Sequence, residues 1–456
     1  MALQVVILAA GKGTRMRSAL PKVMQPLAGK PLLAHVLDAS RTLGAERPIV
    51  VYGHGGDVVQ NAFTNDAIDW VLQAEQKGTG HAVLVALPVL AKEGSTLILY
   101  GDVPLLSVST LQRLLAVCEG KNELGLLTVT LDNPTGYGRI VREAGKVSRI
   151  VEQKDASADE LLIKEVNTGI LCVPNTLLHK WLPELRNANS QGEYYLTDLI
   201  GMATAEGVAV TAVHPETPWE VEGVNDKLQL ATLERVWQRA QADALLRAGV
   251  TIIDPARVDI RGELVHGQDV LLEPNVQING RVVLGDGVQV GIGSVLSNCE
   301  IAAETIIKPY SIIDSASIGE RAQIGPFARI RPGSDLGADV HIGNFVETKA
   351  TRMGAGSKAN HLTYLGDAVI GSGSNIGAGT ITCNYDGANK HLTTIGDNVF
   401  IGSNNSLVAP VEISSNATTG AGSTITKSVA QATLAVSRAK QITLDGWQRP
   451  TKNTTK

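Results

Sequence analysis

The chain has 456 residues, enough for about two or three domains. Hydrophobic residues make up 44% of it and aromatic residues only 4%, and the 47 glycines favour tight turns between small apolar residues over an aromatic-rich core. The net charge of −5 gives no sign of nucleic-acid binding, and no apolar stretch approaches the roughly 20 residues of a membrane span.

The four cysteines are scattered, with no Cys-x-x-Cys motif and no pairing pattern. We therefore expect free thiols in a reducing compartment. The N-terminal stretch MALQVVILAAGKGT has a short apolar run with no basic residues before it, so it is expected to form a strand rather than a signal peptide. These features together predict a cytoplasmic protein.

Residues 1–227 alternate between strand-like and helix-like segments. Short apolar runs such as LQVVILAA, RPIVVYG and LGLLTVTL are typical of buried strands, and PLLAHVLDASRTLG and VSTLQRLLAVCEG have helical spacing. This alternation predicts an α/β domain with a Rossmann-like mixed sheet, mostly parallel. Ligands bind such sheets at the carboxyl ends of the strands.

A long helix is predicted next. Residues 228–248 carry apolar side chains at three- and four-residue steps, with Asn225 and Asp226 suited to cap the first turn and a glycine after the last. We interpret this segment as a linker between an N-terminal domain, 1–227, and a C-terminal domain, 249–456.

A six-residue periodicity follows the helix. Aliphatic residues recur at every sixth position, often with a glycine directly after them. One such residue per face would point into a narrow core, and glycine would permit the corner, so the period predicts a β-helix of about nine or ten three-sided coils. The first two predicted series of inward residues are Leu272, Ile278, Leu284, Val290, Leu296 and Ala302, then Ile306, Ile312, Ile318, Ile324, Ile330, Leu336, Ile342 and Thr348. Later series run from Met353 to Leu365, from Ile370 to Thr382 and from Ile395 to Ile425.

The period breaks between 382 and 395. The stretch CNYDGANKHLTT is therefore expected to loop out of the coil.

The first chemical motif is the turn GKGTRMRSALPK after the first strand. Gly11 and Gly13 would let the backbone approach a ligand, and several cations follow. The motif is not the dinucleotide-binding fingerprint, because Met16 stands where the third glycine would be. It is not a Walker loop either, because no Gly-Lys-Ser/Thr sequence follows. On glycine spacing alone, an ordinary strand–turn–helix with solvated cations is an equal alternative.

The whole string LAAGKGTRM with the later PK resembles the signature of sugar-nucleotide pyrophosphorylases. Further similar motifs follow in order, namely QAEQKGTGHA, YGDVPLL, PTGYGRI, VEQKDA, EVNTGI and VEGVND. Together with the hexad repeat and its insertion, the chain over essentially its whole length is similar to the bacterial bifunctional uridylyltransferase/acetyltransferases. The resemblance implies that the C-terminal region is a left-handed parallel β-helix.

The family resemblance also implies two reactions. Glucosamine 1-phosphate would be N-acetylated with acetyl-CoA at a C-terminal site. UTP would then transfer its uridylyl group to N-acetylglucosamine 1-phosphate at an N-terminal site, with release of pyrophosphate. The product, UDP-N-acetylglucosamine, feeds peptidoglycan and lipopolysaccharide synthesis, and the resemblance implies a homotrimer.

Carried over residue by residue, the resemblance implies that Arg15 and Lys22 neutralise the negative charge of the UTP phosphates and of the leaving pyrophosphate. Asp102 and Asn225 would hold Mg²⁺, a hard ion that prefers oxygen ligands. The other implied residues are Leu8, Ala9, Ala10 and Gly11 as a nucleotide cradle, Gln73, Gly78 and Thr79 at the uracil, Gly138, Glu152 and Asn167 at the sugar, and Tyr100 and Gly101 lining the site. This reaction requires no protein nucleophile, so positioning and charge neutralisation would carry it.

The second chemical motif is KANHLTYLGD, in which His361 follows the inward Ala359 by two positions and therefore points outward. An outward histidine on a smooth coil is usually solvated. A zinc site of the kind some trimeric β-helix enzymes use is not favoured, because His341, His361 and His391 form no close pair in the sequence.

The resemblance implies instead that His361 is the general base for the glucosamine amine and that Glu347 orients it, a role suited to an imidazole. Arg331, Lys349, Tyr364 and Asn375 would bind the sugar phosphate, and Ala378, Asn384, Tyr385, Lys390, Ser403, Ala421 and Arg438 would bind acetyl-CoA. Nothing in the sequence suits a covalent acetyl carrier, so direct attack of the amine on the thioester is expected.

Two other interpretations stay open. One is a single-activity sugar-1-phosphate nucleotidyltransferase whose β-helix regulates or trimerises it. The other is a structural prism without catalytic activity. His361, the insertion and Arg438 argue against the first, and the set Arg15, Lys22, Asp102 and Asn225 argues against the second.

Overall fold

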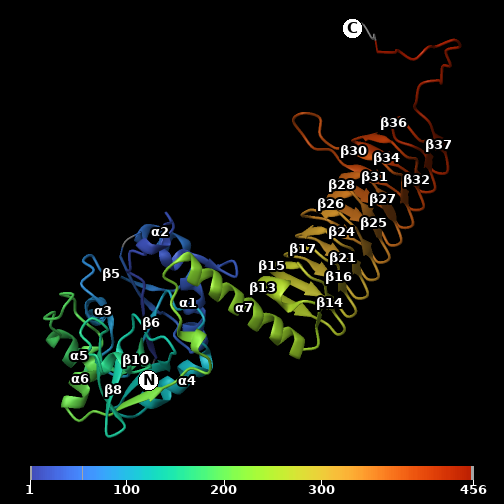
Figure 1. Cartoon of the computed structure of the whole chain (residues 1–456). Coiled ribbons are helices and arrows are strands. Elements are labelled where there is room, and N and C mark those ends of the chain that lie inside the picture. Colours follow the sequence, from blue (N-terminus) through green and yellow to red (C-terminus); the bar gives the residue numbers. More distant parts are fainter. Residues whose placement is uncertain (1–2, 54, 453–456) are drawn as a thin grey trace. The chain divides into compact units, whose positions relative to one another are not determined.

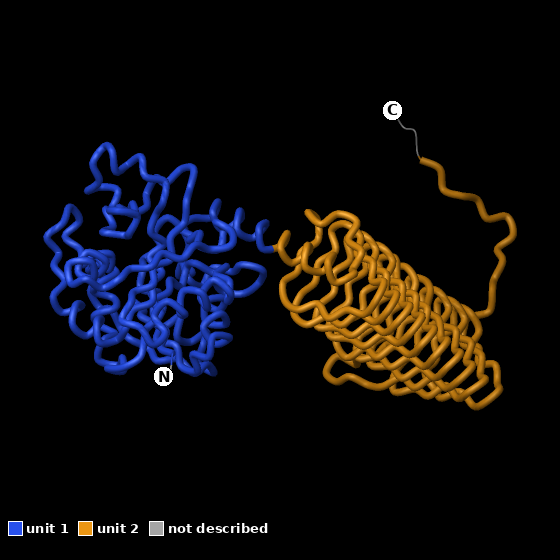
Figure 2. The backbone as a smooth tube through the Cα atoms, turned by 90° about the horizontal axis from the view of Figure 1, so that it is seen from below, with its two compact units in different colours: residues 1–237 blue, residues 238–456 orange. Residues whose placement is uncertain are grey.

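The computed structural model of the chain describes residues 3–53 and 55–452. It divides into two compact units, the first ending at Trp237 and the second beginning at Gln238 (Figure 2). Helix α7 (Lys227–Arg247) runs through the point of division. None of the helices in the described ranges combines the length and the apolar character that crossing a membrane requires.

The first unit is built on a mixed sheet with strand order β11-β7-β10-β6-β1-β4-β5. Figure 1 labels β5, β6 and β10 of this sheet. Strand β10 is antiparallel to its neighbours β6 and β7, while β1 is parallel to both β4 and β6. This confirms the predicted α/β fold with a mixed sheet. The strands are β1 (Gln4–Leu8), β4 (Ile49–Tyr52), β5 (Asp69–Leu72), β6 (Ser95–Tyr100), β7 (Leu124–Thr130), β10 (Glu165–Pro174) and β11 (Val210–Val213), with the hairpins β2 (Pro26–Leu27) and β3 (Lys30–Pro31), and β8 (Arg139–Glu143) and β9 (Lys146–Val151).

Both faces of this sheet are buried, which explains its continuous apolar strands. Along β1, Val5 and Ile7 belong to one core cluster and Val6 to the other, because successive side chains of a strand point to opposite faces. Helices α1 (Leu32–Thr42), α2 (Gly56–Ala62) and α4 (Val108–Cys118) cover the first face, and α3 (Thr79–Ala86), α5 (Asn175–Trp181) and α6 (Asp198–Ala205) the second.

Helix α7 lies within one residue of the predicted bounds 228–248 at each end. The Oδ1 atom of Asp226 accepts a hydrogen bond from the backbone nitrogen of Gln229 at 2.8 Å, which makes Asp226 the N-cap. Gly249 follows the helix with a positive φ of 102°. Asn225 is therefore not needed as the cap.

The second unit is a stack of parallel β-strands in short coils, as the hexad period predicts. One sheet contains β12 (Thr251–Ile252), β14 (Leu271–Leu272), β16 (Gln289–Val290), β19 (Ile306–Ile307), β22 (Gln323–Ile324), β25 (His341–Asn344), β27 (Lys358–His361), β29 (Asn375–Ile376), β32 (Phe400–Ile401), β35 (Thr418–Thr419) and β37 (Leu434–Ala435). The other contains β13 (Asp259–His266), β15 (Gln277–Leu284), β17 (Val295–Ser297), β18 (Glu300–Ile301), β20 (Ile312–Asp314), β21 (Ser317–Ile318), β23 (Arg329–Ile330), β24 (Asp335–Leu336), β26 (Glu347–Met353), β28 (Tyr364–Ile370), β30 (Ile381–Cys383), β31 (Thr393–Ile395), β33 (Ser406–Val408), β34 (Val411–Ile413) and β36 (Thr424–Ile425).

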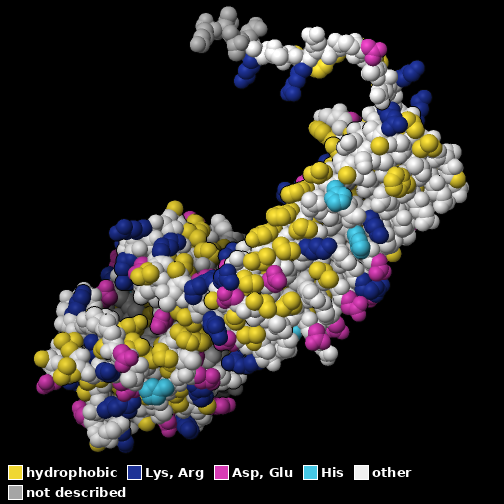
Figure 3. Space-filling model, turned by 45° about the vertical axis from the view of Figure 1, so that its right-hand side comes forward, with side chains coloured by type: hydrophobic (Ala, Val, Ile, Leu, Met, Phe, Trp, Pro, Cys, Tyr) yellow, Lys and Arg dark blue, Asp and Glu magenta, His cyan; other side chains and the backbone are white. Residues whose placement is uncertain are grey.

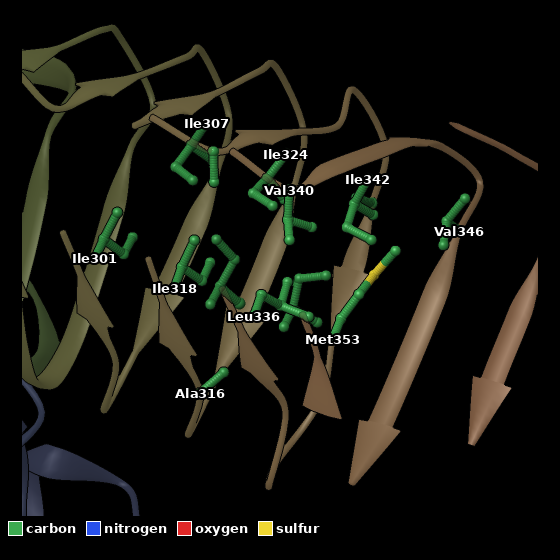
Figure 4. Close-up of a cluster of buried hydrophobic side chains, with 14 of the residues drawn as sticks. Ile301, Ile307, Ala316, Ile318, Ile324, Leu336, Val340, Ile342, Val346 and Met353 are labelled. Carbon is green, nitrogen blue, oxygen red and sulfur yellow. The ribbon is translucent and has the colours of Figure 1, made fainter. Parts of the chain in front are cut away.

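Aliphatic side chains from successive coils meet in one narrow core, as Figure 4 shows for ten labelled residues. Three predicted inward positions are wrong by one residue: Ile301, Ile307 and Ile313 are buried, not Ala302, Ile306 and Ile312. The reason is that Leu296 and Ile301 are five residues apart, so this side of the coil is one residue shorter than the predicted six. A second short side, from Ile313 to Ile318, restores the predicted positions.

The insertion leaves the coil between β30 and β31, as predicted. Ile370 pairs directly with Ile395, so the coil closes beneath the loop without a break in the stack. The loop carries its own short bridge between Tyr385 and Lys390.

Candidate active sites

A cavity of about 340 Å³ opens at the carboxyl ends of β1 and β6. These strands are parallel neighbours with Leu8 opposite Tyr100, so the segments that follow them emerge at the same edge of the sheet. The cavity is lined by ten of the residues predicted for the nucleotide site, namely Leu8, Ala9, Ala10, Gly11, Lys22, Gln73, Gly78, Thr79, Tyr100 and Asp102. Gln76 and Glu193 also line it and were missed: Gln76 lies within the motif QAEQKGTGHA, but the resemblance gave it no role, and Glu193 lies in none of the motifs.

The glycine turn after β1 is shaped around Lys22. Gly13 has a positive φ of 59°, and a Cβ atom there would lie 2.6 Å from the Cβ atom of Lys22. Only glycine allows this approach. At Gly11, a Cβ atom would have nothing within 4 Å, so that position faces open space.

A second cavity of about 310 Å³ shares Tyr100 and Asp102 with the first. Arg15 and Asn225 line it together with the turn that contains Gly136. The two cavities are therefore adjoining parts of one site.

Two cationic side chains and two oxygen-bearing side chains that could ligate a metal meet in this site. The Lys22 ammonium contacts the Asp102 carboxylate and lies 3.3 Å from the Asn225 Oδ1 atom. Arg15 donates to the same Oδ1 atom at 3.0 Å. The donor set of Asp102 and Asn225, a carboxylate and an amide oxygen, fits a hard divalent cation. The described residues contain no cluster of three or more His, Cys, Asp or Glu that could hold a metal by themselves, so other ligands would come from substrate and water.

The predicted sugar residues lie together: Gly138 directly precedes β8, Glu152 directly follows β9, and Asn167 is in β10. The backbone nitrogen of Asn167 donates to the Gly138 carbonyl at 2.9 Å. A Cβ atom at Gly138 would lie 3.3 Å from Glu152 Oε1, so glycine leaves space there. None of the three lines the two cavities described above.

Burial shifts two groups in this region toward their neutral forms. Desolvation raises the pKa of the Glu152 carboxyl, and the negative charges of Asp155 and Asp198 add to the shift. Burial, with the charges of Asp102 and Glu152, also raises the pKa of the Tyr100 phenol. Tyr100 thus stays protonated and is a hydrogen-bonding group rather than an anion.

In the second unit, His361 belongs to a column of outward residues on one edge of the coils. Each member follows a buried inward residue by two positions, and the inward residues pair in register. The His361 Nδ1 atom lies 3.0 Å from Oδ1 of Asn344 on the preceding coil. The column contains Asn344, His361, Ala378, Ser403 and Ala421.

Glu347 makes a different contact from the one predicted. Its Oε1 atom accepts from Arg331 Nη1 at 2.7 Å, and Tyr364 lies beside it on the next coil. Within the chain, the structure brings Glu347 to Arg331 and Asn344 to His361. Sequence reasoning missed Asn344, and the role of Glu347 in orienting the imidazole stays a prediction.

Asp367, also missed, connects residues from two predicted subsites. Its carboxylate accepts from the side-chain amide of Asn384 and lies 3.4 Å from the Lys349 ammonium. Lys349 in turn lowers the pKa of Lys390, which extends from the inserted loop. The carboxylate therefore holds a predicted acetyl-CoA residue beside a predicted sugar-phosphate residue.

The remaining predicted acetyl-CoA residues follow the same edge. Arg438 donates to the Ala421 carbonyl at 2.7 Å. The loop is held by Asp386, which accepts from the backbone nitrogens of Ala388 and Asn389 and contacts His391 at 2.6 Å. Tyr385 at the loop is 60% exposed and open to a ligand.

Different parts of the chain match different family models. A MobA-like NTP transferase domain matches residues 5–188, a GMPPB C-terminal domain matches 260–353, and a bacterial transferase hexapeptide (six repeats) matches 392–427. The Bifunctional protein GlmU of Acinetobacter baumannii (strain AYE) is 60% identical over 99% of this chain and 99% of its own length. That of Acinetobacter baylyi (strain ATCC 33305 / BD413 / ADP1) is 59% identical over the same shares.

The chain belongs to the GlmU family. It is a bifunctional enzyme of UDP-N-acetylglucosamine synthesis, with a nucleotidyltransferase part and a hexapeptide-repeat acetyltransferase part. Membership of the GlmU family disfavours both alternatives left open by the sequence, the single-activity nucleotidyltransferase and the prism without catalytic activity.

Proposed function

We propose that the two reactions are divided between the two halves of the chain. Residues 1–227 would form the uridylyltransferase, 228–248 a linking helix and 249–456 the acetyltransferase. The observation that carries this proposal is that the cluster of Lys22, Asp102 and Asn225 and the pair of His361 and Asn344 lie in different compact units.

In the uridylyltransferase, a phosphate oxygen of N-acetylglucosamine 1-phosphate attacks the α-phosphorus of UTP, and pyrophosphate leaves. Both reactants are anions, so bringing them together requires positive charge. Lys22 and Arg15 supply it at the point where the two cavities adjoin. The residues of the chain thus act by positioning and neutralising rather than by covalent chemistry.

Asp102 and Asn225 would hold the divalent cation, which we propose is Mg²⁺. Bound there, Mg²⁺ would supply positive charge that offsets the negative charge of the phosphates. Glu152, Asn167 and Gly138 would bind the sugar and its N-acetyl group. Leu8, Ala9, Ala10 and Gly11 would cradle the nucleotide, with Tyr100 and Gly101 lining the site and Gln73, Gly78 and Thr79 at the uracil.

In the acetyltransferase, the base is His361. A hydrogen bond from Nδ1–H to the amide oxygen of Asn344 leaves the lone pair on Nε2. Nε2 takes a proton from the glucosamine ammonium, the freed amine forms a bond to the acetyl carbon of acetyl-CoA, and the carbon–sulfur bond breaks. After the attack the nitrogen still carries two hydrogens and releases one as a proton, while the departing CoA sulfur takes up one proton. Of the two protons that the nitrogen loses in all, one ends on CoA and the other passes to solvent, so the imidazole is neutral again.

The other residues bind the two substrates. Arg331 and Lys349 suit the sugar phosphate, with Tyr364 and Asn375 beside it, and Asn384 would polarise the thioester carbonyl. The small side chains of Ala378, Ser403 and Ala421 leave room for CoA along the edge of the coils, and the CoA subsite would be completed by Tyr385, Lys390 and Arg438.

We also propose a homotrimer in the cytoplasm, where UTP and acetyl-CoA are made. Hydrophobic side chains gather in a row along the β-helix in Figure 3. Tyr310, Phe327, Phe345 and Leu362 occupy equivalent exposed corners, the first three stacked with ring centroids 5.4 and 5.5 Å apart. Leu362 adjoins His361. A neighbouring copy of the chain that covered this row of exposed hydrophobic side chains would therefore enclose the acetyltransferase site.

The proposal is tested by supplying the intact protein with one substrate pair at a time. Glucosamine 1-phosphate with acetyl-CoA should release CoA without UTP, and N-acetylglucosamine 1-phosphate with UTP and Mg²⁺ should release pyrophosphate without acetyl-CoA. If either release required the other pair of substrates, the assignment of independent sites would be wrong.

A further inference from the structure

The carboxamide of Gln73 is fixed in the wall of the nucleotide cavity. The residue is only 3% exposed. Its Nε2 atom lies 3.1 Å from the Gly78 carbonyl oxygen and 3.1 Å from Nδ1 of His81. A carbonyl oxygen only accepts, so the NH₂ group, not the oxygen, faces Gly78. Among the described residues, no donor contacts the Gln73 oxygen, and the side chain lines the cavity.

His81 acts as the second acceptor for this NH₂ group. It lies on the first turn of α3, two residues after Thr79. Because an NH₂ group donates, Nδ1 must carry a lone pair and the ring proton must be on Nε2. The imidazole also lies beside the Tyr194 ring, with centroids 6.2 Å apart. His81 therefore has two contacts that can be separated by substitution.

We infer that His81 is a specificity-determining residue that locks the Gln73 carboxamide with its oxygen toward the bound base. A flipped amide would bring its oxygen against two acceptors, the Gly78 carbonyl and His81 Nδ1. The locked amide offers the base a single acceptor. N3–H of uracil is a donor and matches it, whereas N3 of cytosine is an acceptor and is rejected.

This inference rests on the proposed function, in which the cavity holds the base of UTP. It goes further by assigning the preference for UTP over CTP to a residue that would not itself touch the nucleotide. His81 is thus a positioning residue that acts through Gln73.

Two substitutions separate the hydrogen bond from the packing. His81→Asn keeps an acceptor near the Nδ1 position but removes the ring beside Tyr194. His81→Phe keeps a ring and removes the acceptor. The measurement is kcat/KM for pyrophosphate release with UTP and with CTP, at fixed N-acetylglucosamine 1-phosphate and Mg²⁺.

We expect His81→Phe to lower the UTP-to-CTP ratio of kcat/KM by about 2- to 10-fold, the effect of one hydrogen bond, since the Gly78 carbonyl still opposes the flip. His81→Asn should keep the ratio within about twofold of the unsubstituted enzyme. CoA release by the other half of the chain should stay normal in both, which reports that the variants are folded.

The inference is overturned if His81→Phe keeps the ratio, if His81→Asn loses it as fully as His81→Phe does, or if both variants lose activity with both nucleotides while CoA release persists. If the unsubstituted enzyme released no pyrophosphate from UTP, the proposed function itself would fail, a result distinct from these.

Discussion

The imidazole Nδ1 atom of His361 lies 3.0 Å from the amide oxygen of Asn344, on the coil before it. This contact fixes the plane of the ring and places the ring proton on Nδ1. The other nitrogen is left to accept a proton. Two residues at equivalent positions of successive coils thus prepare His361 for its proposed role as general base.

Replacing Asn344 with Ala should remove this constraint and lower kcat for CoA release by about 3- to 10-fold, the effect of one hydrogen bond. Asn344→Asp keeps an acceptor at the same place and should retain most of the rate. Steady-state kinetics with glucosamine 1-phosphate and acetyl-CoA measures both. Equal rates for Asn344→Ala and the unsubstituted enzyme would mean that the contact does not prepare the base.

Gly13→Ala tests how closely the glycine turn fits Lys22. The new Cβ atom would lie 2.6 Å from Lys22 Cβ, in a backbone conformation with positive φ, so Lys22 must move. We expect pyrophosphate release to fall on the order of 10²-fold, because displaced charge no longer meets the phosphates. CoA release should be unaffected.

The matched control for this substitution is Gly201→Ala. Gly201 lies in α6, its added Cβ atom would have nothing within 4 Å, and its φ is not positive. Pyrophosphate release should stay normal in this variant. A similar loss in both variants would show that the effect is not specific to the turn.

Asp367→Ala should lower kcat for CoA release by about 10-fold, because the Asn384 amide loses the carboxylate that holds it. In an Asn384→Ala background the same change should cost much less, since the shared contact is already gone. A double-mutant cycle on kcat measures this coupling. Fully additive effects would refute the view that Asp367 acts through Asn384.

Glu152→Gln should change how stability depends on pH. Burial raises the pKa of Glu152 above 4.5, so the folded state binds the proton more tightly than the unfolded chain does. Stability of the unsubstituted protein should therefore decline as pH rises through 4.5 toward the raised pKa, and the glutamine variant should lack this part of the decline. Thermal unfolding midpoints of the two proteins at several pH values test this, and a constant difference between them would contradict it.

Much of the architecture follows from the sequence, because its periods are physical. Continuous apolar strands predict a sheet buried on both faces, and the hexad period predicts the coils. The spacing alone does not determine the phase of that period. At Ile306–Ile307 and Ile312–Ile313 two adjacent aliphatic residues both satisfy the pattern, and only the pairing of Val290 with Ile307 decides which one points inward.

Contacts between coils could not be predicted for the same reason. With a uniform coil of 18 residues, Gly343 rather than Asn344 would precede His361 in the column. The coil is one residue shorter there, which brings Asn344 to the imidazole. Likewise, Asp367 ends the motif KANHLTYLGD without a role implied by the resemblance, and only the stacking of the next coil brings Asn384, directly after β30, to its carboxylate.

The central claim is that one chain carries two independent sites, and a crossed assay of two variants tests it most directly. His361→Ala should lose CoA release with glucosamine 1-phosphate and acetyl-CoA while keeping pyrophosphate release, and Asp102→Ala should do the reverse. An equal mixture of the two variants should then convert glucosamine 1-phosphate, acetyl-CoA and UTP to UDP-N-acetylglucosamine. Loss of both activities in either folded variant would contradict the account.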